Sequence, residues 1–268
     1  MGRTSKAPSI KLGLTLPPDG QLLMRYAVIS DIHSNLEALT AFLKAAENLD
    51  IDKTICLGDI VGYNANPNEC IELLREREVH CLLGNHDSRV VGFEDPADFN
   101  LHASEAVYWT RDAISQENLT FLTNLPRNFL VNNKFLAVHG WVNDTDRYIM
   151  GQRDAERNFA LMVEKKATLG LCFFGHTHVP VAYAMKGEEL SVVTENPFKL
   201  EKGVRYLVNP GSIGQPRDRD PRASFLVYDA KKKKVTFHRV DYDIHATTEK
   251  ILAAGLPERL AERLKLGW

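Results

Sequence analysis

The chain contains 268 residues, of which 44% are apolar and 25% are charged. These proportions match the average of globular domains and exclude a largely disordered or fibrous protein. Lys and Arg number 33 against 35 Asp and Glu, so the formal net charge is −2. Proteins that neutralise duplex phosphates carry a basic excess, so we expect no duplex nucleic acid as a partner. No apolar run approaches the roughly 20 residues that span a bilayer, so we expect no membrane partner either.

The N-terminal segment, residues 1–24, is predicted to be an extension outside the core. It is interrupted by Pro17 and Pro18 and lacks the continuous apolar stretch of a signal peptide, so we expect a cytoplasmic protein. Residues 25–268 contain no internal repeat, low-complexity segment or linker. We therefore predict one domain over 25–268.

Strand and helix patterns alternate from residue 26 onward. An apolar run predicts a buried strand over Tyr26–Ser30, and an amphipathic pattern predicts a helix over Leu36–Asn48. A strand over Lys53–Leu57, a helix over Pro67–Glu78 and a strand over Val79–Leu83 follow. This βαβαβ order predicts a parallel sheet covered by helices.

The rest of the chain mixes helices with a β-rich C-terminal half. Segment 94–125 is predicted to hold two helices, over His102–Ser115 and Glu117–Asn124, which form either a cap over the site or part of the core. Further strands are expected over Phe135–Val138, Leu171–Phe174, Val179–Met185, Leu190–Thr194, Arg205–Val208, Ala223–Tyr228 and Val235–Val240, and further helices over Arg153–Lys166, Ile244–Ala254 and Pro257–Lys265.

Five polar clusters directly follow apolar runs. They are Asp31-Ile32-His33, Gly58-Asp59, Gly84-Asn85-His86-Asp87, His139-Gly140 and Gly175-His176-Thr177-His178. Open α/β sheets bind ligands at the carboxyl ends of their strands, so we expect these clusters to converge. Residues two apart at a strand end point the same way, which would let Asp31 and His33 hold one ion. The same spacing applies to His176 and His178.

Taken singly, each cluster has a structural explanation, such as a helix cap or a core histidine. Together they supply more ligands than one ion can coordinate, and mixed oxygen and nitrogen ligands suit a pair of divalent metals. Paired ions stabilise the attacking and leaving oxygens of an in-line phosphoryl displacement.

The ordered set D-x-H, G-D, G-N-H-D, H-G and G-H-T-H across residues 31–178 resembles the calcineurin-like metallophosphoesterase superfamily. Flanking motifs resemble a bacterial single-domain phosphoesterase branch, among them Phe99-Asn100 and Asn209-Pro210-Gly211-Ser212. The resemblance implies an α/β fold, a four-layer αββα sandwich of two mixed β-sheets flanked by helices. It also implies two divalent ions per chain, for which we expect Mn²⁺, with Fe, Zn or Ni as alternatives.

The resemblance also implies a role for each polar residue. Asp59 would bridge both metals, and His86 would face the substrate, where it protonates the leaving oxygen or stabilises phosphoryl charge. The first metal would be held by Asp31, His33 and His178, and the second by Asn85, His139 and His176.

This chain departs from the motifs of related phosphoesterases at two places beside the predicted metal ligands. Phosphoprotein phosphatases have a second Asp and an Arg where this chain has Gly62 and Tyr63, so a protein-phosphatase activity lacks its histidine-orienting and phosphate-binding groups. Asn64-Ala65 replaces the usual Gly-Pro, and Trp141-Val142-Asn143 follows His139-Gly140 in place of a small polar turn. These departures bear on substrate preference.

Three arginines are candidates for binding the substrate phosphate, because a guanidinium forms bidentate contacts with phosphate oxygens. Arg217 and Arg222 lie in the loop after the Asn-Pro-Gly-Ser turn, and Arg89 follows the Asn85-His86-Asp87 turn. The alternating Arg and Asp residues of 217–222 are equally consistent with a self-paired surface loop.

These features predict a metal-dependent phosphoric ester hydrolase acting on a small phosphodiester or nucleotide by in-line attack of a metal-bridging hydroxide. The enzymatic alternatives are a dinucleoside polyphosphate hydrolase, a phosphomonoesterase and a protein serine/threonine phosphatase. The non-enzymatic alternative is a catalytically silent metal-binding scaffold, which the intact set of ligands argues against. The oligomeric state stays open.

Overall fold

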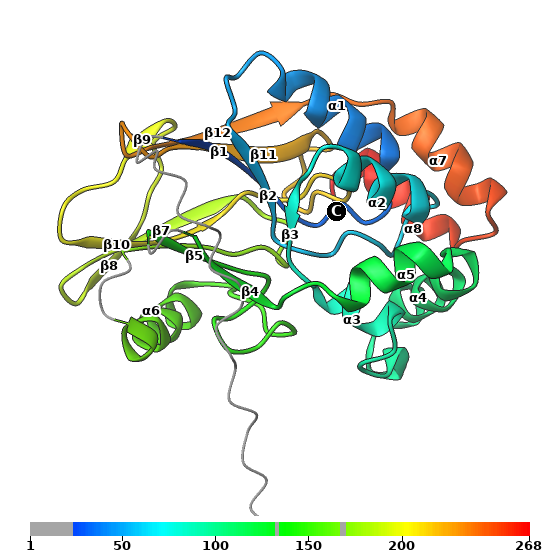
Figure 1. Ribbon diagram of the computed structural model, residues 1–268, viewed down its shortest axis with the longest axis horizontal. Coiled ribbons are helices and arrows are strands. Elements are labelled where there is room, and N and C mark those ends of the chain that lie inside the picture. The colour runs from blue at the N-terminus through cyan, green and yellow to red at the C-terminus, as the bar shows by residue number, and fades with distance from the viewer. Residues whose placement is uncertain (1–23, 132–133, 167–169) are drawn as a thin grey trace, which may run out of the picture.

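The computed structural model describes residues 24–131, 134–166 and 170–268, and within them two six-stranded sheets lie face to face (Figure 1). The first has the order β3-β2-β1-β11-β12-β9, formed by His80–Cys81, Lys53–Cys56, Arg25–Ile29, Ala223–Asp229, Lys234–Val240 and Phe198–Lys199. The second has the order β4-β5-β6-β10-β7-β8, formed by Asn128–Val131, Phe135–Val138, Leu171–Phe173, Val204–Asn209, Val181–Lys186 and Glu189–Val192. Both sheets contain parallel and antiparallel pairs, which confirms the predicted pair of mixed sheets.

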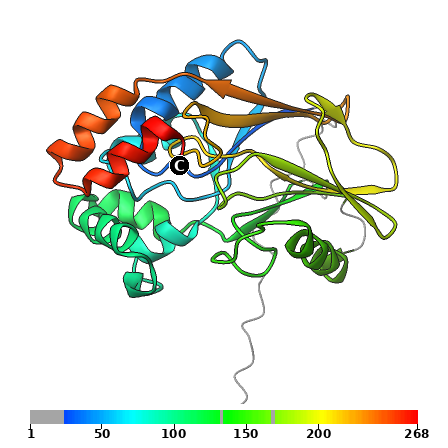
Figure 2. The same cartoon turned by 180° about the vertical axis from the view of Figure 1, so that it is seen from behind.

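Helices cover the outer faces of this pair of sheets. In Figures 1 and 2, α1 lies on the first sheet with α7 beside it, α6 lies on the second sheet, and α4, α5 and α8 gather at one side. The helices are α1 (Leu36–Ala46), α2 (Pro67–Glu76), α3 (Asn85–Val90), α4 (Leu101–Ala113), α5 (Gln116–Thr123), α6 (Gln152–Lys166), α7 (Ile244–Ala253) and α8 (Glu258–Leu266), with a short 3-10 turn, η1, at Pro96–Asp98. The layers therefore run helix, sheet, sheet, helix, as the resemblance implied.

Strand β1 shows why its sequence is apolar throughout. Ala27 and Ile29 pack into the core under the helices of the first sheet, whereas Tyr26 and Val28 pack into the core between the two sheets. A central strand of a two-sided sheet buries both faces, so it reads as a continuous apolar run without alternation.

The parallel strands position the polar clusters. Strand β1 runs parallel to β2, and β2 to β3, while β6 runs parallel to both β5 and β10. Carboxyl ends of parallel strands lie at one edge of a sheet, and in this fold both sheets present that edge to the same side. The five clusters therefore meet between the sheets.

Four elements differ from the predictions. Strand β3 is only His80–Cys81, and Asn85 begins helix α3, so the cluster predicted at a strand end lies in the first turn of a helix. Strands β4 and β9 were not predicted. Both are short edge strands of four and two residues, too brief to show a period-2 pattern.

The predicted N-terminal extension lies almost entirely outside the described residues, which begin at Met24. Met24 itself belongs to the domain, because its side chain is buried and its carbonyl accepts a hydrogen bond from Ala230 N at 3.1 Å. Within the part of the chain that the structure describes, no helix is long and apolar enough to cross a membrane.

Candidate metal centre

The loops after β1, β2 and β6 carry their polar residues in a left-handed backbone conformation. Asp31, His33, Asp59, His176 and His178 have φ angles between 50° and 68°. Asp and His tolerate this region better than most residues, and such strain concentrates at functional sites. The side chains therefore do converge, but not by the strand-end alternation from which we predicted that Asp31 and His33 point the same way. Strand β1 ends at Ile29, and tight turns beyond it aim the side chains inward.

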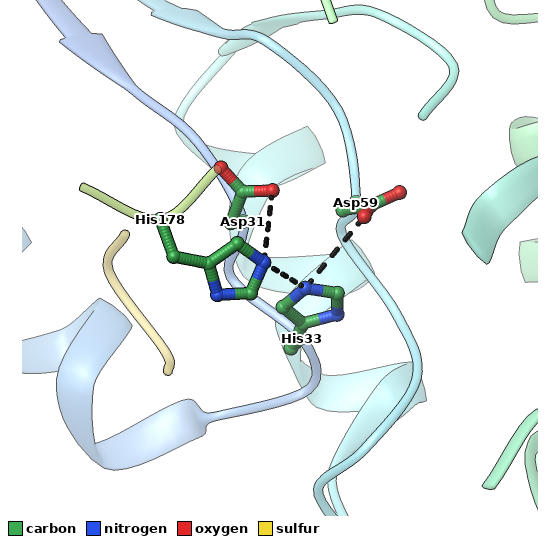
Figure 3. A group of neighbouring side chains, drawn as sticks. All are labelled: Asp31, His33, Asp59 and His178. Carbon is green, nitrogen blue, oxygen red and sulfur yellow. Dashed lines mark hydrogen bonds and ion pairs between the residues drawn. The ribbon is translucent and has the colours of Figure 1, made fainter. Parts of the chain in front are cut away.

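A first group of side chains comprises Asp31, His33, Asp59 and His178, all buried (Figure 3). Their ligand atoms lie within 4.8 Å of one another. His178 Nε2 lies 3.4 Å from Asp31 Oδ1 and 3.2 Å from His33 Nε2. His33 Nε2 in turn lies 3.6 Å from Asp59 Oδ2. Three separate loops thus direct four ligand atoms toward one point.

Backbone carbonyls determine the tautomers of the two histidines in this group. His33 Nδ1 lies 3.1 Å from Val61 O, and His178 Nδ1 lies 2.6 Å from Gln215 O. A carbonyl only accepts, so each Nδ1 carries the proton and each Nε2 presents a lone pair. Two lone pairs then face each other across 3.2 Å. This arrangement is repulsive unless a cation lies near both atoms.

A second group comprises Asp59, His139 and His176, with Asn85 beside them. His139 Nε2 lies 2.9 Å from Asn85 Oδ1, 3.2 Å from His176 Nδ1 and 3.3 Å from Asp59 Oδ2. The structure therefore brings together every residue predicted to hold the second ion.

The histidines of the second group are oriented by the same device. His139 Nδ1 donates to Leu57 O at 3.0 Å, so its Nε2 faces inward. Although burial alone would lower the pKa of His139, Asp59 raises that pKa to about 9, so a cation would bind Nε2 in place of a proton. His176 has the opposite tautomer. Its Nε2 donates to Asp146 O at 3.1 Å, and its Nδ1 lone pair faces the group. Each ring is held by a backbone carbonyl on the side away from the site.

Asp59 belongs to both groups. Its Oδ2 lies 3.6 Å from His33 Nε2 and 3.3 Å from His139 Nε2, while its Oδ1 accepts the backbone N–H of His86 at 2.8 Å. Although burial alone would raise it, the pKa of Asp59 lies well below its usual value, because His139 and His86 stabilise the carboxylate. Asp59 is thus placed to bridge two cations.

The chemistry of these donors fits two divalent cations. Burial lowers the pKa of His33 and His178 well below the usual value and that of His176 to about 3, so these rings are neutral ligands. Asp31 Oδ1 is buried without a hydrogen-bond partner in the described residues. A buried, unpaired carboxylate oxygen is costly, and a cation satisfies it. The two groups therefore form a possible dimetal site of mixed oxygen and nitrogen ligands.

His86 lies beside the two groups without joining them. It is the second residue of α3, and its ring packs between Tyr63 and Phe99, with centroids at 4.5 and 4.6 Å. Its Nδ1 is buried and has no hydrogen-bond partner among the described residues. Burial lowers the pKa of His86 to about 4, so the ring is neutral near pH 7. The predicted strand alternation does not separate His86 from Asn85. They diverge because consecutive helical residues point in different directions.

Gly62 and Tyr63 explain how His86 is accommodated. Gly62 has a φ of +93°, and a Cβ placed on it would lie 2.7 Å from His86 Nδ1. A side chain at this position would therefore collide with the ring. Tyr63 covers His86 and also contacts the ring of His33, with centroids 4.6 Å apart. The two departures from the protein-phosphatase motif leave His86 positioned by ring packing.

The three candidate arginines have different surroundings. Arg217 lies next to the first group, since its backbone N–H donates to His178 O at 3.3 Å, and its charge, after burial, lowers the pKa of His178. Arg222 is half-exposed and pairs with Asp220 at 2.7 Å, so the structure does not bring it to the site. Arg89 is buried but occupied, with Asp98 and Asp146 each 2.6 Å from its guanidinium.

Two residues of the sequence motifs, Asp87 and Asn64, were given no role from the sequence but support the site. Asp87 accepts the backbone N–H groups of Ile60, Val61 and Gly84 at 2.9–3.0 Å and so fixes the loop that carries Asp59. Asn64 donates to His33 O at 2.6 Å. Their signal in the sequence was only a polar residue next to a ligand motif, which does not distinguish a loop brace from a ligand.

The loop after His139-Gly140 has a clear structural purpose. Trp141 Nε1 donates to Tyr148 O at 2.8 Å and holds the loop closed. The loop supplies the carbonyl of Asp146 to His176, and the ring of Tyr148 stacks on His176 at a centroid distance of 3.8 Å. The unexpected Trp141 therefore helps to orient a ligand.

Segment 94–125 contributes to the site at one end only. Phe99 contacts His86, and Arg89 lies over the Phe99 ring at 4.1 Å. Trp109 Nε1 donates to Ala254 O at 3.0 Å, and Tyr108 is exposed. Val107 of α4 and Leu122 of α5 belong to the core cluster under the first sheet, which favours core packing for most of the segment.

Comparison with known proteins agrees with this geometry. Residues 24–233 match the family model of the calcineurin-like phosphoesterase superfamily domain. The chain is 42% identical over 245 residues to the uncharacterized protein MJ0912 of Methanocaldococcus jannaschii. The matched region covers 90% of this chain and 97% of that protein.

Two solved structures share the fold over nearly the whole chain. A metallophosphoesterase from Sphaerobacter thermophilus is 38% identical, with a TM-score of 0.78, over 91% of this chain and 99% of that one. The hypothetical protein PH1004 from Pyrococcus horikoshii is 24% identical, with a TM-score of 0.75, over 91% and 98% of the two chains. The similarity to PH1004, at 24% identity, shows a shared fold only.

Proposed function

The chain belongs to the calcineurin-like phosphoesterase superfamily, and on that premise we propose that it hydrolyses a small phosphodiester or nucleotide with the help of two divalent cations. One observation supports this proposal most strongly. Two groups of inward-facing lone pairs share Asp59 Oδ2, and their histidines are fixed in the ligating tautomer by backbone carbonyls. Such a site is suited to phosphoryl displacement.

The ligands divide between the two cations as follows. The first would be held by Asp31, His33, Asp59 and His178, and the second by Asp59, Asn85, His139 and His176. When bound, two divalent cations supply positive charge for the phosphoryl oxygens and lower the pKa of water, and we propose Mn²⁺ as the native ion.

The chain's own residues position the substrate and the proton. A ring N–H of His86 would donate to the leaving oxygen, since His86 borders Asp59 and is no part of the ligand groups. The guanidinium of Arg217 would bind a phosphoryl oxygen next to the first group. Tyr63 and Phe99 exclude water from the far side of His86, which strengthens its hydrogen bond to the substrate.

A protein-phosphatase activity is the less favoured alternative. Gly62 provides no carboxylate for His86 Nδ1, and Tyr63 provides no guanidinium for the phosphate. We therefore propose that the partner is a small molecule, and that phosphoserine and phosphothreonine peptides are poor substrates.

The test is reconstitution with Mn²⁺, Fe²⁺, Zn²⁺ or Ni²⁺, followed by elemental analysis and kinetics. We expect two ions per chain and a higher kcat/KM for bis-p-nitrophenyl phosphate than for p-nitrophenyl phosphate or a phosphoserine peptide. A higher kcat/KM for the peptide would overturn the substrate class. Two bound ions without turnover of any phosphoester, dinucleoside polyphosphates included, would show a metal-binding scaffold.

A further inference from the structure

The buried guanidinium of Arg89, in the last turn of α3, joins two loops from distant parts of the chain. Its Nε and Nη2 donate to the two carboxylate oxygens of Asp98 at 3.0 and 2.6 Å. Its Nη1 donates to Asp146 Oδ1 at 2.6 Å and to Asn85 O at 3.2 Å. The Arg89 side chain is 3% exposed, whereas those of Asp98 and Asp146 are 62% and 41% exposed. A rigid, buried fork thus holds two carboxylates that reach in from the surface.

On one side, this bridge leads to the second ligand group. Asp146, whose carboxylate accepts from Arg89, is also the residue whose carbonyl accepts from His176 Nε2 at 3.1 Å. Arg89 Nη1 also bonds Asn85 O, and Asn85 Oδ1 lies 2.9 Å from His139 Nε2. A displacement of Asp146 or of the first turn of α3 would therefore shift ligand atoms of the second group.

On the other side, the bridge leads to His86. The Arg89 Cζ atom lies 4.1 Å from the centroid of the Phe99 ring, and Phe99 directly follows Asp98. The same Phe99 ring packs against His86, with centroids 4.6 Å apart. Because His86 Nδ1 has no hydrogen-bond partner among the described residues, ring packing determines its orientation. Arg89 therefore fixes one of the rings that hold His86.

The first ligand group is held without Arg89. His33 and His178 donate to backbone carbonyls of other loops. Among the described residues, the Arg89 guanidinium forms no hydrogen bond or ion pair with Asp31, His33 or His178. The bridge is therefore connected to one of the two ligand groups and to His86, and not to the other group.

We propose that Arg89 is a positioning residue, which places the second cation site and His86 together by holding Asp146 behind His176 and Phe99 against His86. This inference rests on the proposed function. Groups that orient a ligand histidine from outside typically change metal affinity or activity roughly 10- to 100-fold when they are removed. The arginine considered as a phosphate ligand thus serves the reaction without touching the substrate.

The experiment removes each half of the bridge separately. Asp146→Ala removes one carboxylate and keeps the backbone carbonyl for His176, and Asp98→Ala removes the other carboxylate. Both side chains are well exposed, so both variants should fold. The matched control is Glu117→Ala, because the exposed Glu117 pairs with Arg75 at 2.7 Å outside the site.

Each protein is titrated with Mn²⁺ by calorimetry, its Tm is measured, and kcat is determined on two phosphodiesters. Bis-p-nitrophenyl phosphate has a good leaving group, and the dinucleotide thymidylyl-3′,5′-thymidine has a poor one. The Mn²⁺ affinities report on the ligand groups without any turnover, and the ratio of the two kcat values reports on proton donation by His86.

We expect Asp146→Ala to weaken one Mn²⁺ binding event about 10-fold or more and to leave the other unchanged. Asp98→Ala should bind both ions like the wild type but lose about 10-fold in kcat on the dinucleotide, and less on bis-p-nitrophenyl phosphate. Arg89→Lys should show both defects, because an ammonium cannot bond two carboxylates as a fork. Glu117→Ala should match the wild type in both measurements.

Two wild-type Mn²⁺ affinities in Asp146→Ala, or equal losses on both esters in Asp98→Ala, would overturn the inference while the proposed function stands. A lower Tm in both variants, with unchanged Mn²⁺ affinities and an unchanged ratio of the two kcat values, would reduce Arg89 to a structural brace and overturn it as well. Conversely, a weakened Mn²⁺ binding event in Asp146→Ala, when the wild type turns over neither ester, would support the role of Arg89 at the second cation site and refute the proposed function.

Discussion

The histidines of the metal centre and His86 lie within one site but are held in different ways. Each ring in the two ligand groups donates one N–H to a backbone carbonyl, as His33 does to Val61 O and His139 to Leu57 O. His86 has no such anchor on Nδ1 and is positioned by the rings of Tyr63 and Phe99.

The difference matches the tasks of the two regions. A ligand histidine needs one tautomer and one orientation, and a carbonyl on its outer nitrogen supplies both. A residue that donates a proton or hydrogen bond to a substrate needs a ring whose protonation is free to change. Ring packing holds the position of His86 without tying either nitrogen. The predictions below test this division.

The largest effect is expected for Asp59→Asn, because Asp59 belongs to both ligand groups. The amide is neutral and weakens both sites at once, so transition-state stabilisation of several kcal/mol is lost. We expect kcat to fall by at least about 10³-fold. Elemental analysis should show loss of both ions. Retention of two ions by an active variant would contradict the bridging role.

His86→Ala tests the other region, with His139→Ala as its matched comparison. We expect His86→Ala to keep both ions and lose about 10²–10⁴-fold in kcat on an ester with a poor leaving group, the usual scale of general acid catalysis. The loss should be smaller for a p-nitrophenyl ester, whose leaving group hardly needs a proton.

His139→Ala should instead lose one ion, and activity with it on both kinds of ester. Metal content and kcat are measured for both variants. If His86→Ala loses an ion as readily as His139→Ala, the two histidines do not differ in the way their hydrogen bonds indicate.

Asp87→Asn should act on the loop between the two regions. The carboxylate of Asp87 accepts three backbone N–H groups, and an amide leaves at least one of these donors unpaired. We expect a loss of about 1–3 kcal/mol in the free energy of unfolding. In a domain of this size that lowers Tm by roughly 2–4 °C per kcal/mol, which calorimetry measures. An unchanged Tm would show that Asp87 does not brace the loop.

The smallest effect is expected for Arg222→Gln. Arg222 pairs with Asp220 on the surface, and an exposed ion pair contributes little. Metal content and kcat/KM should equal those of the wild type, whereas Arg217→Gln should lower kcat/KM about 10-fold or more through the lost phosphate contact. A clear defect in Arg222→Gln would place that arginine at the substrate.

Much of the candidate site follows from the sequence because of one regularity of α/β folds. Residues that directly follow parallel strands meet at one edge, so the apolar runs before Asp31, Asp59 and His176 were sufficient to predict that these side chains converge. The same runs predicted a parallel sheet covered by helices, whereas the pair of mixed sheets was implied by the family resemblance. We did not predict the short strands β4 and β9 or the start of α3 at Asn85, because sequence patterns this brief do not differ from those of loops.

The sequence by itself determined which residue types gather between the sheets, because polar side chains after buried apolar strands have few other places to go. Only the tertiary structure decided how they are used. The tautomer of His139 depends on Leu57 O, 82 positions away, and that of His178 on Gln215 O, 37 positions away. Arg89 pairs with Asp146, 57 positions away, only because the loop after β5 lies against α3. Hydrogen bonds and charge pairs of this kind depend on distances of a few ångströms between remote segments, which residue spacing along the chain does not encode.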